Sequence, residues 1–353
     1  MSSSGHTVEG AIEVAALLEA GALAPSSHNT QPWRLRWHNG AVEVHGDLDR
    51  ALPVSDPEHR ELRVACGAAL ANVRLAVRAQ GRRAHVRLLP DPDDPWFLGT
   101  VTTGGHLPAT STETALAQAI PHRRTDRSAV SGEGVSPRVR EELRRAAQQE
   151  HSWAVLLDDG RDRNALEDLA VRAHARQQSD PAFRAEWTRW VGTDGDHGTG
   201  LPAELVRRAP RPDGRWRLRD FGADADPDDE RPPAVVDEPA LLVVATTFDQ
   251  PLAHLYAGQA LQHVLLLATV RGLAASFVAP PVEVPETRAA LRSLLGGALW
   301  PQVVLRLGVA QRAVARPPRR DPGAAVRQAP GWDALAGSVA DLPDGEVPPA
   351  RAP

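Results

Sequence analysis

A run of short polar side chains between residues 25 and 33 is the first candidate for chemistry. It reads APSSHNTQPW from Ala24 to Trp33 and directly follows an apolar stretch with helical spacing, AIEVAALLEAGALA. Proline cannot continue that helix, and serine and asparagine readily bond local backbone, so a polar turn is one interpretation. A binding loop is the other, because amide and hydroxyl groups beside a tryptophan suit a flat heteroaromatic ligand with carbonyls on its rim.

Arginines form the second candidate group. The segment PHRRTDRSAV (121–130) precedes a helical stretch, and RPPRR (316–320) follows the apolar run PQVVLRLGV. All 40 Lys and Arg residues are arginine, so an anion must be met by guanidinium or backbone N–H groups. Arginine forks are preferred partners of phosphate oxygens, and each charge-assisted bond contributes about 1.5–3 kcal/mol. An exposed basic turn is the alternative interpretation.

The composition argues against several other classes of protein. The formal net charge is −5 and no apolar run approaches the roughly 20 residues of a membrane span, so we expect neither a nucleic-acid nor a membrane partner. One cysteine, Cys66, and an N-terminus without signal-peptide features predict a cytoplasmic location. No HExxH, GxSxG, Walker or GxGxxG pattern is present, and we expect no metal site.

The chain resembles itself at two fixed offsets. At 191 residues, CGAALANVRLAVRAQG (66–81) aligns with AGQALQHVLLLATVRG (257–272), which pairs Gly67 with Gly258. At 120 residues, a helix followed by the strand-like run WRLRW, which begins at Trp33, aligns with a helix followed by WAVLL, which begins at Trp153. Two matches in the same order predict a duplicated α+β unit.

The repeat divides the chain near residue 118. We expect a first half at 1–118, a second half at 119–337 and a flexible tail at 338–353. The second half carries an irregular insertion at about 180–238, which is either a disordered loop or a lid over a site. Phe183, Trp187 and Trp190 have helical spacing and favour a packed cap for its first part.

At this point the motifs carry a resemblance. APSSHNTQPWRL resembles the flavin-facing loop of the FMN-dependent nitroreductase family, HRRTDR resembles the motif that binds the FMN phosphate, and the helix ending in RGLAAS resembles the element that presents backbone N–H groups to the flavin. Together with PPRR, the motifs are most similar to the Acg-type branch of actinobacteria. The resemblance implies an α+β nitroreductase-like fold, with a central, mainly antiparallel sheet flanked by helices and two tandem halves forming a pseudo-dimer.

The halves differ in complementary ways. The second half has lost the polar loop, and the first half has SSGHT where the second has RRTDR. One complete set remains, so the resemblance implies a single FMN between the halves of one chain, which can still self-associate. The cofactor-binding residues it implies are Pro25, Ser26, Ser27, Asn29, Gln31, Arg123, Arg124, Thr125, Arg127, Ser276, Val278, Ala279, Arg319 and Arg320.

Two further roles, and one departure from the family pattern, concern the loops themselves. We expect Trp33 to anchor its loop in the core and His28 to make a loop hydrogen bond. SFVAPPVE lacks the acid–glycine pair of the family, and Pro280 and Pro281 have no N–H, so a donor to the flavin must come from Val278 or Ala279. No catalytic side chain is expected, because the flavin carries the chemistry.

The expected function is NAD(P)H-dependent reduction of nitroaromatics, quinones or a similar small-molecule electron acceptor by an FMN-containing oxidoreductase. The main alternative is a protein that stores or sequesters FMN beneath the lid with little or no turnover. A flavin-free relic is the third interpretation.

Overall fold

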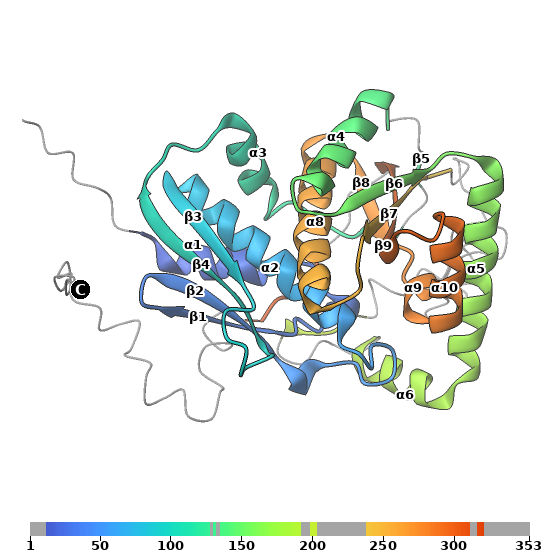
Figure 1. Ribbon diagram of the computed structural model, residues 1–353. Helices are drawn as coiled ribbons and strands as arrows, with labels where there is room; N and C mark the ends of the chain where they lie inside the picture. Colours follow the sequence, from blue (N-terminus) through green and yellow to red (C-terminus); the bar gives the residue numbers. More distant parts are fainter. Residues whose placement is uncertain are drawn as a thin grey trace, which may run out of the picture.

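Two antiparallel sheets lie on either side of a central pair of helices (Figure 1). The computed structural model describes residues 12–127, 130–131, 135–191, 198–202, 238–310 and 316–320. The first sheet contains, in order, β1 (Trp33–His38), β2 (Ala41–Gly46), β4 (Phe97–His106) and β3 (Arg82–Leu88). The second contains β6 (Trp153–Leu157), β7 (Ala240–Thr246), β9 (Trp300–Ala310) and β8 (Ala274–Phe277), with β5 (Val130–Ser131) on the C-terminal end of β9.

The two sheets have the same strand order. In each, the first strand pairs with the second, the second with the fourth and the fourth with the third, and all these pairs are antiparallel. The predicted α+β fold of two tandem halves is confirmed, with one sheet in each half. We propose the boundary between the halves near residue 118, at the end of α3 (Ser111–Ala119).

The helices surround and separate the sheets. The central pair is α2 (Arg60–Ala79) and α8 (Pro251–Val270). The others are α1 (Val14–Ala22), α3, α4 (Pro137–Gln148), α5 (Gly160–Ser179), α6 (Pro181–Trp190), α9 (Pro280–Glu283) and α10 (Pro285–Leu294), with short 3-10 turns at Ser27–Asn29 and Leu48–Arg50. Local sequence explains several starts: Ser136 and Asp180 cap α4 and α6, and each of these helices has proline in its first turn.

The central helices are repeats of each other. A shift of 191 residues maps the bounds of α2, Arg60–Ala79, onto those of α8, Pro251–Val270. Glycine allows their close approach: a Cβ at Gly67 would lie 2.4 Å from the Leu255 carbonyl oxygen, and one at Gly258 would lie 2.1 Å from that of Val64. The paired glycines predicted from sequence therefore form the crossing point.

Each half buries one residue of the other half in its core. Val64 of α2 packs into the cluster around the second sheet, and its repeat partner Leu255 of α8 packs into the cluster around the first. Apolar burial at roughly 25 cal/mol per Å² then stabilises the pairing of the halves as well as each half. The two halves form one structural unit through this exchange.

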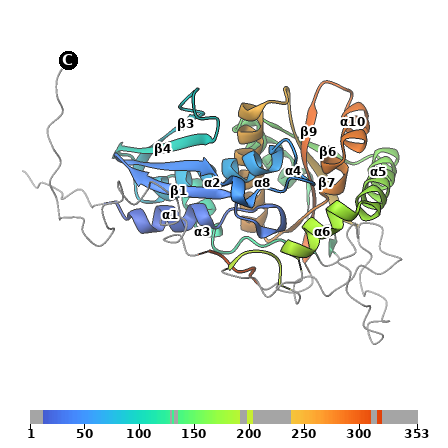
Figure 2. The ribbon, with the colours of Figure 1, turned by 90° about the horizontal axis from the view of Figure 1, so that it is seen from below.

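Part of the insertion is helical. The predicted cap at Phe183, Trp187 and Trp190 is confirmed as α6, which contacts α5, and Phe183 is buried. In Figure 2, α6 and the short segments 198–202 and 316–320 lie along the same lower edge of the molecule. The rest of the insertion up to residue 237, the SSGHT segment and the tail 338–353 lie outside the described residues.

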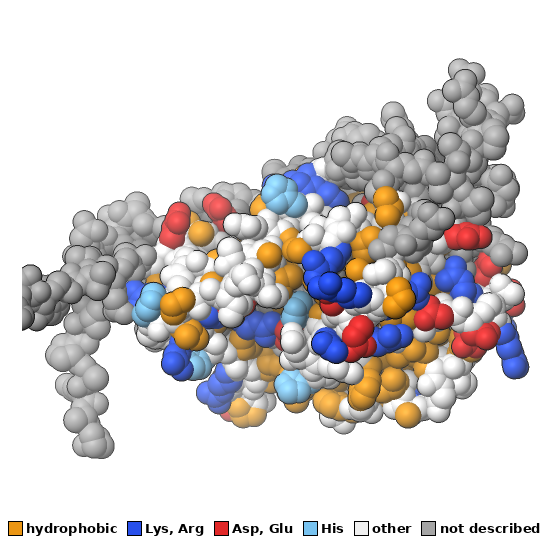
Figure 3. Space-filling model, turned by 90° about the horizontal axis from the view of Figure 1, so that it is seen from above, with side chains coloured by type: hydrophobic (Ala, Val, Ile, Leu, Met, Phe, Trp, Pro, Cys, Tyr) orange, Lys and Arg blue, Asp and Glu red, His pale blue; other side chains and the backbone are white. Residues whose placement is uncertain are grey.

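Surface charge and helix length are consistent with the composition. Acidic and basic side chains lie side by side over the face in Figure 3, as expected for a formal net charge of −5. Within the described ranges, no helix is both long and apolar enough to cross a bilayer.

Candidate functional site

The loop between α1 and β1 has an unusual backbone. His28, Asn29 and Gln31 all adopt positive φ, at 49°, 57° and 51°. Ser26 holds this conformation: its carbonyl accepts from the Asn29 N–H at 3.1 Å, and its Oγ accepts from the Gln31 N–H at 2.9 Å. Left-handed backbone at three non-glycine residues is unfavourable, so the surroundings must specify it.

Trp33 supplies part of that surrounding structure. It is 2% exposed and belongs to the core of the first half, which confirms its predicted role as the anchor of the loop. His28 is buried, and its ring lies edge-on to that of Trp187 in α6, with centroids 4.9 Å apart and an interplanar angle of 73°. The loop is therefore fixed on one side by the core and on the other by the cap.

Two segments distant in sequence cover the amide side chains of the loop. Asn29 Nδ2 donates to the Gly200 carbonyl at 3.0 Å and to the Pro318 carbonyl at 2.9 Å. Gln31 Nε2 donates to the Gly198 carbonyl at 2.8 Å, and Gln31 Oε1 accepts from the Arg320 N–H at 3.0 Å. We call residues 198–202 and 316–320 the two covering segments.

The second covering segment also connects the loop to the predicted arginine motif. Arg319 Nη1 donates to Asn29 Oδ1, and Nη2 donates to the Leu23 and Ala24 carbonyls at 3.4 and 3.2 Å. Burial, and then the charges of Arg123, Arg316 and Arg124, lower the pKa of Arg319 to about 9. The positive field at Arg319 therefore comes from residues in both predicted arginine segments.

Arg123 is the least compensated member of this arginine cluster, which comprises Arg123, Arg124, Arg316 and Arg319. It follows α3, is 5% exposed, and its Nε and Nη1 have no hydrogen-bond partner within the described part of the chain. Burial, and then Arg124 and Arg316, lower its pKa to about 10. A buried, unpaired cation is costly, typically by about 3–5 kcal/mol, so the cluster has the properties of an anion site.

The rest of the motif is attached to the second sheet. Thr125 forms a parallel bridge with Ala275 of β8, and the Asp126 N–H donates to the Ala275 carbonyl at 2.9 Å. Arg124 Nη1 donates to the Pro121 and Arg123 carbonyls, both at 2.8 Å, whereas Arg127 is exposed. The motif thus reaches the strand that leads to residues 276–279.

One sequence prediction in that strand needs correction. The Val278 N–H donates to the Val304 carbonyl at 2.9 Å, and its side chain is buried, so this amide is already used by the sheet and is not a donor to a ligand. Ser276 is likewise buried within β8, opposite Arg306. Ala279, at the start of α9, is partly exposed, and its N–H has no partner among the described residues. Of the two predicted donors, Ala279 remains.

Sequence reasoning missed two charged residues beside these elements, Arg60 and Glu61, and named Arg316 only as part of RPPRR. Glu61 accepts a hydrogen bond from Ser27 Oγ, and Arg60 reaches the second half, where its Nη2 donates to the Val282 carbonyl at 3.1 Å. Arg316 joins the arginine cluster, a place that the run RPPRR already suggested. For Arg60 and Glu61 the only sequence signal is their position at the start of a helix that is buried over most of its length.

Most of the predicted site residues therefore come together. Loop 25–31, Arg319 and Arg320 are in direct contact, and Arg123 and Arg124 lie close enough to Arg319 to act on its pKa. Arg127 is exposed, and Ser276 lies within β8 opposite Arg306. No group of three or more potential metal ligands occurs within the described ranges.

Comparison with known proteins identifies the family. No family model matches the chain. "Putative NAD(P)H nitroreductase Rv3131" of Mycobacterium tuberculosis is 34% identical over 300 residues, which cover 84% of each chain. "Putative NAD(P)H nitroreductase acg" of the same organism is 31% identical over 296 residues, covering 84% of this chain and 88% of the relative. The chain belongs to the nitroreductase family. The crystal structure of a "putative nitroreductase" from Anabaena variabilis is similar with a TM-score of 0.45 and 10% identity, over 86% of this chain and 90% of that one.

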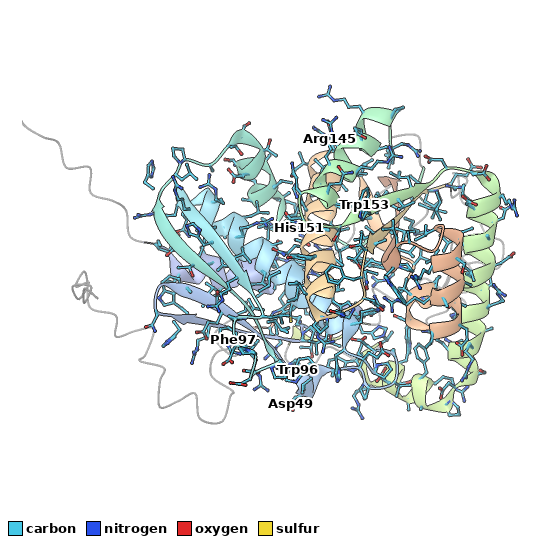
Figure 4. The ribbon with its side chains drawn as sticks, in the orientation of Figure 1. Asp49, Trp96, Phe97, Arg145, His151 and Trp153 are labelled. Carbon is cyan, nitrogen blue, oxygen red and sulfur yellow. The ribbon has the colours of Figure 1, made fainter. Side chains whose placement is uncertain are left out.

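The segment of this nitroreductase-family chain that aligns with the loop has a different structure, because its first four residues are the last turn of α4. Residues 145–151 are the counterpart of 25–31 at the offset of 120, and Figure 4 shows Arg145, His151 and Trp153 near the end of α4 and the start of β6. Here Glu150 accepts hydrogen bonds from both terminal nitrogens of Arg74 and from His263 Nδ1 at 3.3 Å. Burial alone would raise the pKa of Glu150, but these partners outweigh it and lower the pKa to about 2. An internal ion pair occupies the counterpart position.

Proposed function

We propose that the chain binds one FMN between its two halves and uses NAD(P)H to reduce nitroaromatics, quinones or similar electron-poor acceptors. One observation carries the proposal: Arg123 is buried among other arginines, with two nitrogens that lack a partner among the described residues. A phosphate monoester matches this site, because its oxygens accept charge-assisted bonds from several guanidinium groups at once. The names of the relatives support the reductant and the class of acceptor.

Residues of both halves would hold the cofactor. Arg123, Arg124 and Arg319 would hold the phosphate, while Ser27, Asn29, Gln31 and the Ala279 N–H would face the ring and the ribityl chain. The FMN would supply the two-electron chemistry that side chains lack. Asn29 and Gln31 now bond the covering segments, so binding would require them to exchange those partners for the ligand. A single chain supplies every group in this set.

Absorbance and reduction of the purified chain test the proposal. The expected result is a yellow protein whose flavin band bleaches promptly when NADPH is added without oxygen and returns when a quinone is added. The Arg123→Met variant should be colourless or nearly so, whereas Arg172→Met, which removes an exposed arginine of α5, should remain yellow. A colourless wild-type protein that takes up no added FMN would overturn the proposal.

A second candidate, FMN storage, is favoured by the covering segments. Gly198 has φ +79°, and a Cβ there would lie 2.3 Å from the Arg319 carbonyl oxygen, so Gly198→Ala would separate the two segments. Gly40→Ala is the matched control, because Gly40 has φ +76° with no atom within 4 Å. If the protein stores FMN, reduction by NADPH should be slow in the wild type and in Gly40→Ala, and faster in Gly198→Ala.

The cellular setting is also a proposal. The only cysteine of the sequence, Cys66, is buried and cannot form a disulfide within the chain. This supports a cytoplasmic location, because proteins of a reducing compartment do not depend on disulfides.

A further inference from the structure

Glu61 lies behind the loop that we propose faces the flavin ring, at the contact between the two halves. It accepts hydrogen bonds from Ser27 Oγ and, at 3.0 Å, from Arg60 Nη2. Arg60 also donates to two carbonyls of the second half, those of Val282 and Gln302. Glu61 is therefore fixed between the loop of the first half and α9 of the second.

The carboxyl group and its serine partner line a small cavity. Ser27, Thr30, Asp56 and Glu61 are among the residues around it, and its volume of about 10 Å³ is enough for about one water molecule. Asn29 and Gln31 are bonded to the covering segments, whereas the Ser27 hydroxyl is bonded to Glu61. Within the loop, Ser27 thus connects the pocket to a group that can hold a proton.

Other carboxylates act on Glu61. Burial, and then the Glu283 carboxylate of α9, raise its pKa to about 7; Asp56 acts in the same direction, and Arg60 and the Ser27 hydroxyl act against it. Near neutral pH the carboxyl group therefore alternates between its protonated and its ionised form.

Glu283 is itself fixed from the second half. Gln177 Nε2 of α5 donates to Glu283 Oε2, so the second carboxylate is positioned independently of Glu61. The pocket also contains Arg50, whose pKa is lowered, chiefly by burial. The groups around Glu61 thus come from the 3-10 turn Leu48–Arg50, the segment before α2, α2 itself and α9.

We propose that Glu61 is a positioning residue that supplies a proton for acceptor reduction through the Ser27 hydroxyl. The inference rests on the proposed function. It assigns a task to a carboxyl group that no family motif in the sequence contained.

The proton balance explains why such a group is useful. Reduction of a quinone to a hydroquinone consumes two electrons and two protons. NAD(P)H supplies both electrons and one proton as it is oxidised to NAD(P)⁺. When Glu61 is protonated, its hydrogen bond with Ser27 is reversed relative to the ionised form: the carboxyl O–H donates to Ser27 Oγ, and the Ser27 hydroxyl donates to the quinone oxygen. The second proton passes from Ser27 Oγ to the quinone oxygen, while Glu61 gives its proton to Ser27 Oγ, and the Glu61 carboxylate then takes a proton from a hydronium ion. Of the two new O–H bonds of the hydroquinone, one replaces the C–H bond that NAD(P)H loses and the other replaces the O–H bond that hydronium loses.

The first test needs neither cofactor nor acceptor. The free energy of unfolding is measured against pH for the wild type, Glu61→Gln and Glu19→Gln, an exposed control in α1. The pKa of Glu61 is about 7 in the folded chain and 4.5 ordinarily. The free energy of unfolding should therefore fall as the pH rises from 4.5 to 7 in the wild type and the control. Glu61→Gln should lack that fall. An unchanged profile in Glu61→Gln would overturn the proposal.

The second test measures the reaction with 1,4-benzoquinone. We expect the rate of acceptor reduction to show a break near pH 7 in the wild type and in Glu19→Gln, and no break in Glu61→Gln or Ser27→Ala. The rate should fall about 100-fold, as is typical when a positioned acid is lost, and Glu61→Asp should restore a break. The rate of reduction by NADPH should be the same in the wild type, Glu61→Gln and Glu61→Asp, which a merely structural role for Glu61 would not produce.

The two tests separate the possible failures. A chain that takes up no FMN overturns the proposed function and this role with it, whatever the unfolding profile shows. If Glu61→Gln reduces the quinone at the wild-type rate and with the wild-type pH profile, only the role of Glu61 is overturned.

Discussion

The loop 25–31 and its counterpart 145–151 have the same place in the two halves and opposite chemistry. Each precedes the first strand of its sheet, and Gln31 and His151, which align at the offset of 120, have φ values of 51° and 54°. In the first copy, amide side chains bond two distant segments. In the second, Glu150 bonds Arg74 and His263 of the central helices. The positive φ at the last position is common to both segments, but residues 145–148 are helical and Gln149 has φ −61°, whereas His28 and Asn29 have positive φ, so both backbone and side chains have diverged.

The difference lies in how charge is compensated. Around the counterpart, one buried carboxylate meets two basic side chains, and the ion pair is internal. Around the loop, burial and then the charges of other arginines lower the pKa values of Arg123 and Arg319, and both side chains retain a nitrogen without a partner among the described residues. Buried charge without a partner destabilises a fold unless a ligand completes it. The counterpart is therefore closed by an internal ion pair, whereas the arginine cluster has the uncompensated charge that we propose a phosphate completes.

The helix crossing that relates the two copies gives the largest expected effect. Gly258→Ala places a Cβ 2.1 Å from the Val64 carbonyl oxygen, a backbone atom that can move only if α2 and α8 separate. The free energy of unfolding should fall by about 3 kcal/mol or more. Chemical denaturation measures it, with Gly160→Ala as the control, because nothing lies within 4 Å of that glycine. If Gly258→Ala lowers the free energy of unfolding by no more than Gly160→Ala does, the halves do not meet at this point.

The ion pair of the counterpart gives the next largest effect. The pKa of Glu150 is lowered from 4.5 to about 2, so Glu150→Gln should cost about 2–3 kcal/mol at neutral pH. In the wild type this contribution is present above pH 4.5 and is lost as the pH falls toward 2. Denaturation at several pH values should show the two proteins converging in acid.

An exposed glutamate serves as the control for that variant. Glu141 of α4 forms a surface pair with Arg145, so Glu141→Gln should change stability by less than about 0.5 kcal/mol at any pH. Equal effects of the two substitutions would mean that the counterpart loop is not held by its ion pair.

Local patterns predicted the repeated fold well and long-range partners poorly. Spacing located both central helices, but each begins six residues earlier than expected. In α2 the reason is its charged first turn, which looks exposed until the other half covers it. Trp33 was assigned to the core by its type and position. The bond from Asn29 to the Pro318 carbonyl joins residues 289 positions apart, and the Val278 amide is used by β9; no local pattern contains either fact.

The charge contrast between the copies can be tested at Arg123. Arg123→Met removes a buried cation that lacks partners, so the ligand-free protein should keep or gain stability. FMN affinity should fall roughly tenfold to 100-fold, because one charge-assisted contact to phosphate contributes about 1.5–3 kcal/mol. Fluorescence titration with FMN and denaturation of the ligand-free protein measure the two effects. A loss of both affinity and ligand-free stability would show that Arg123 has an internal partner and that the contrast is wrong.

Substitution of the aligned pair Asn29 and Gln149 gives the smallest effect and the sharpest test of the loops. Asn29→Ala removes the bonds to the Gly200 and Pro318 carbonyls and the bond from Arg319, at a cost of about 1–2 kcal/mol. Gln149 is exposed, so Gln149→Ala should be nearly neutral. Limited proteolysis should cleave near residues 316–320 faster in Asn29→Ala than in Gln149→Ala, because Asn29 bonds that covering segment directly. Equal rates would mean that the bonds between Arg320 and Gln31 are what hold residues 316–320 in place. The Asn29 side chain would then serve to bind a ligand rather than to hold this covering segment.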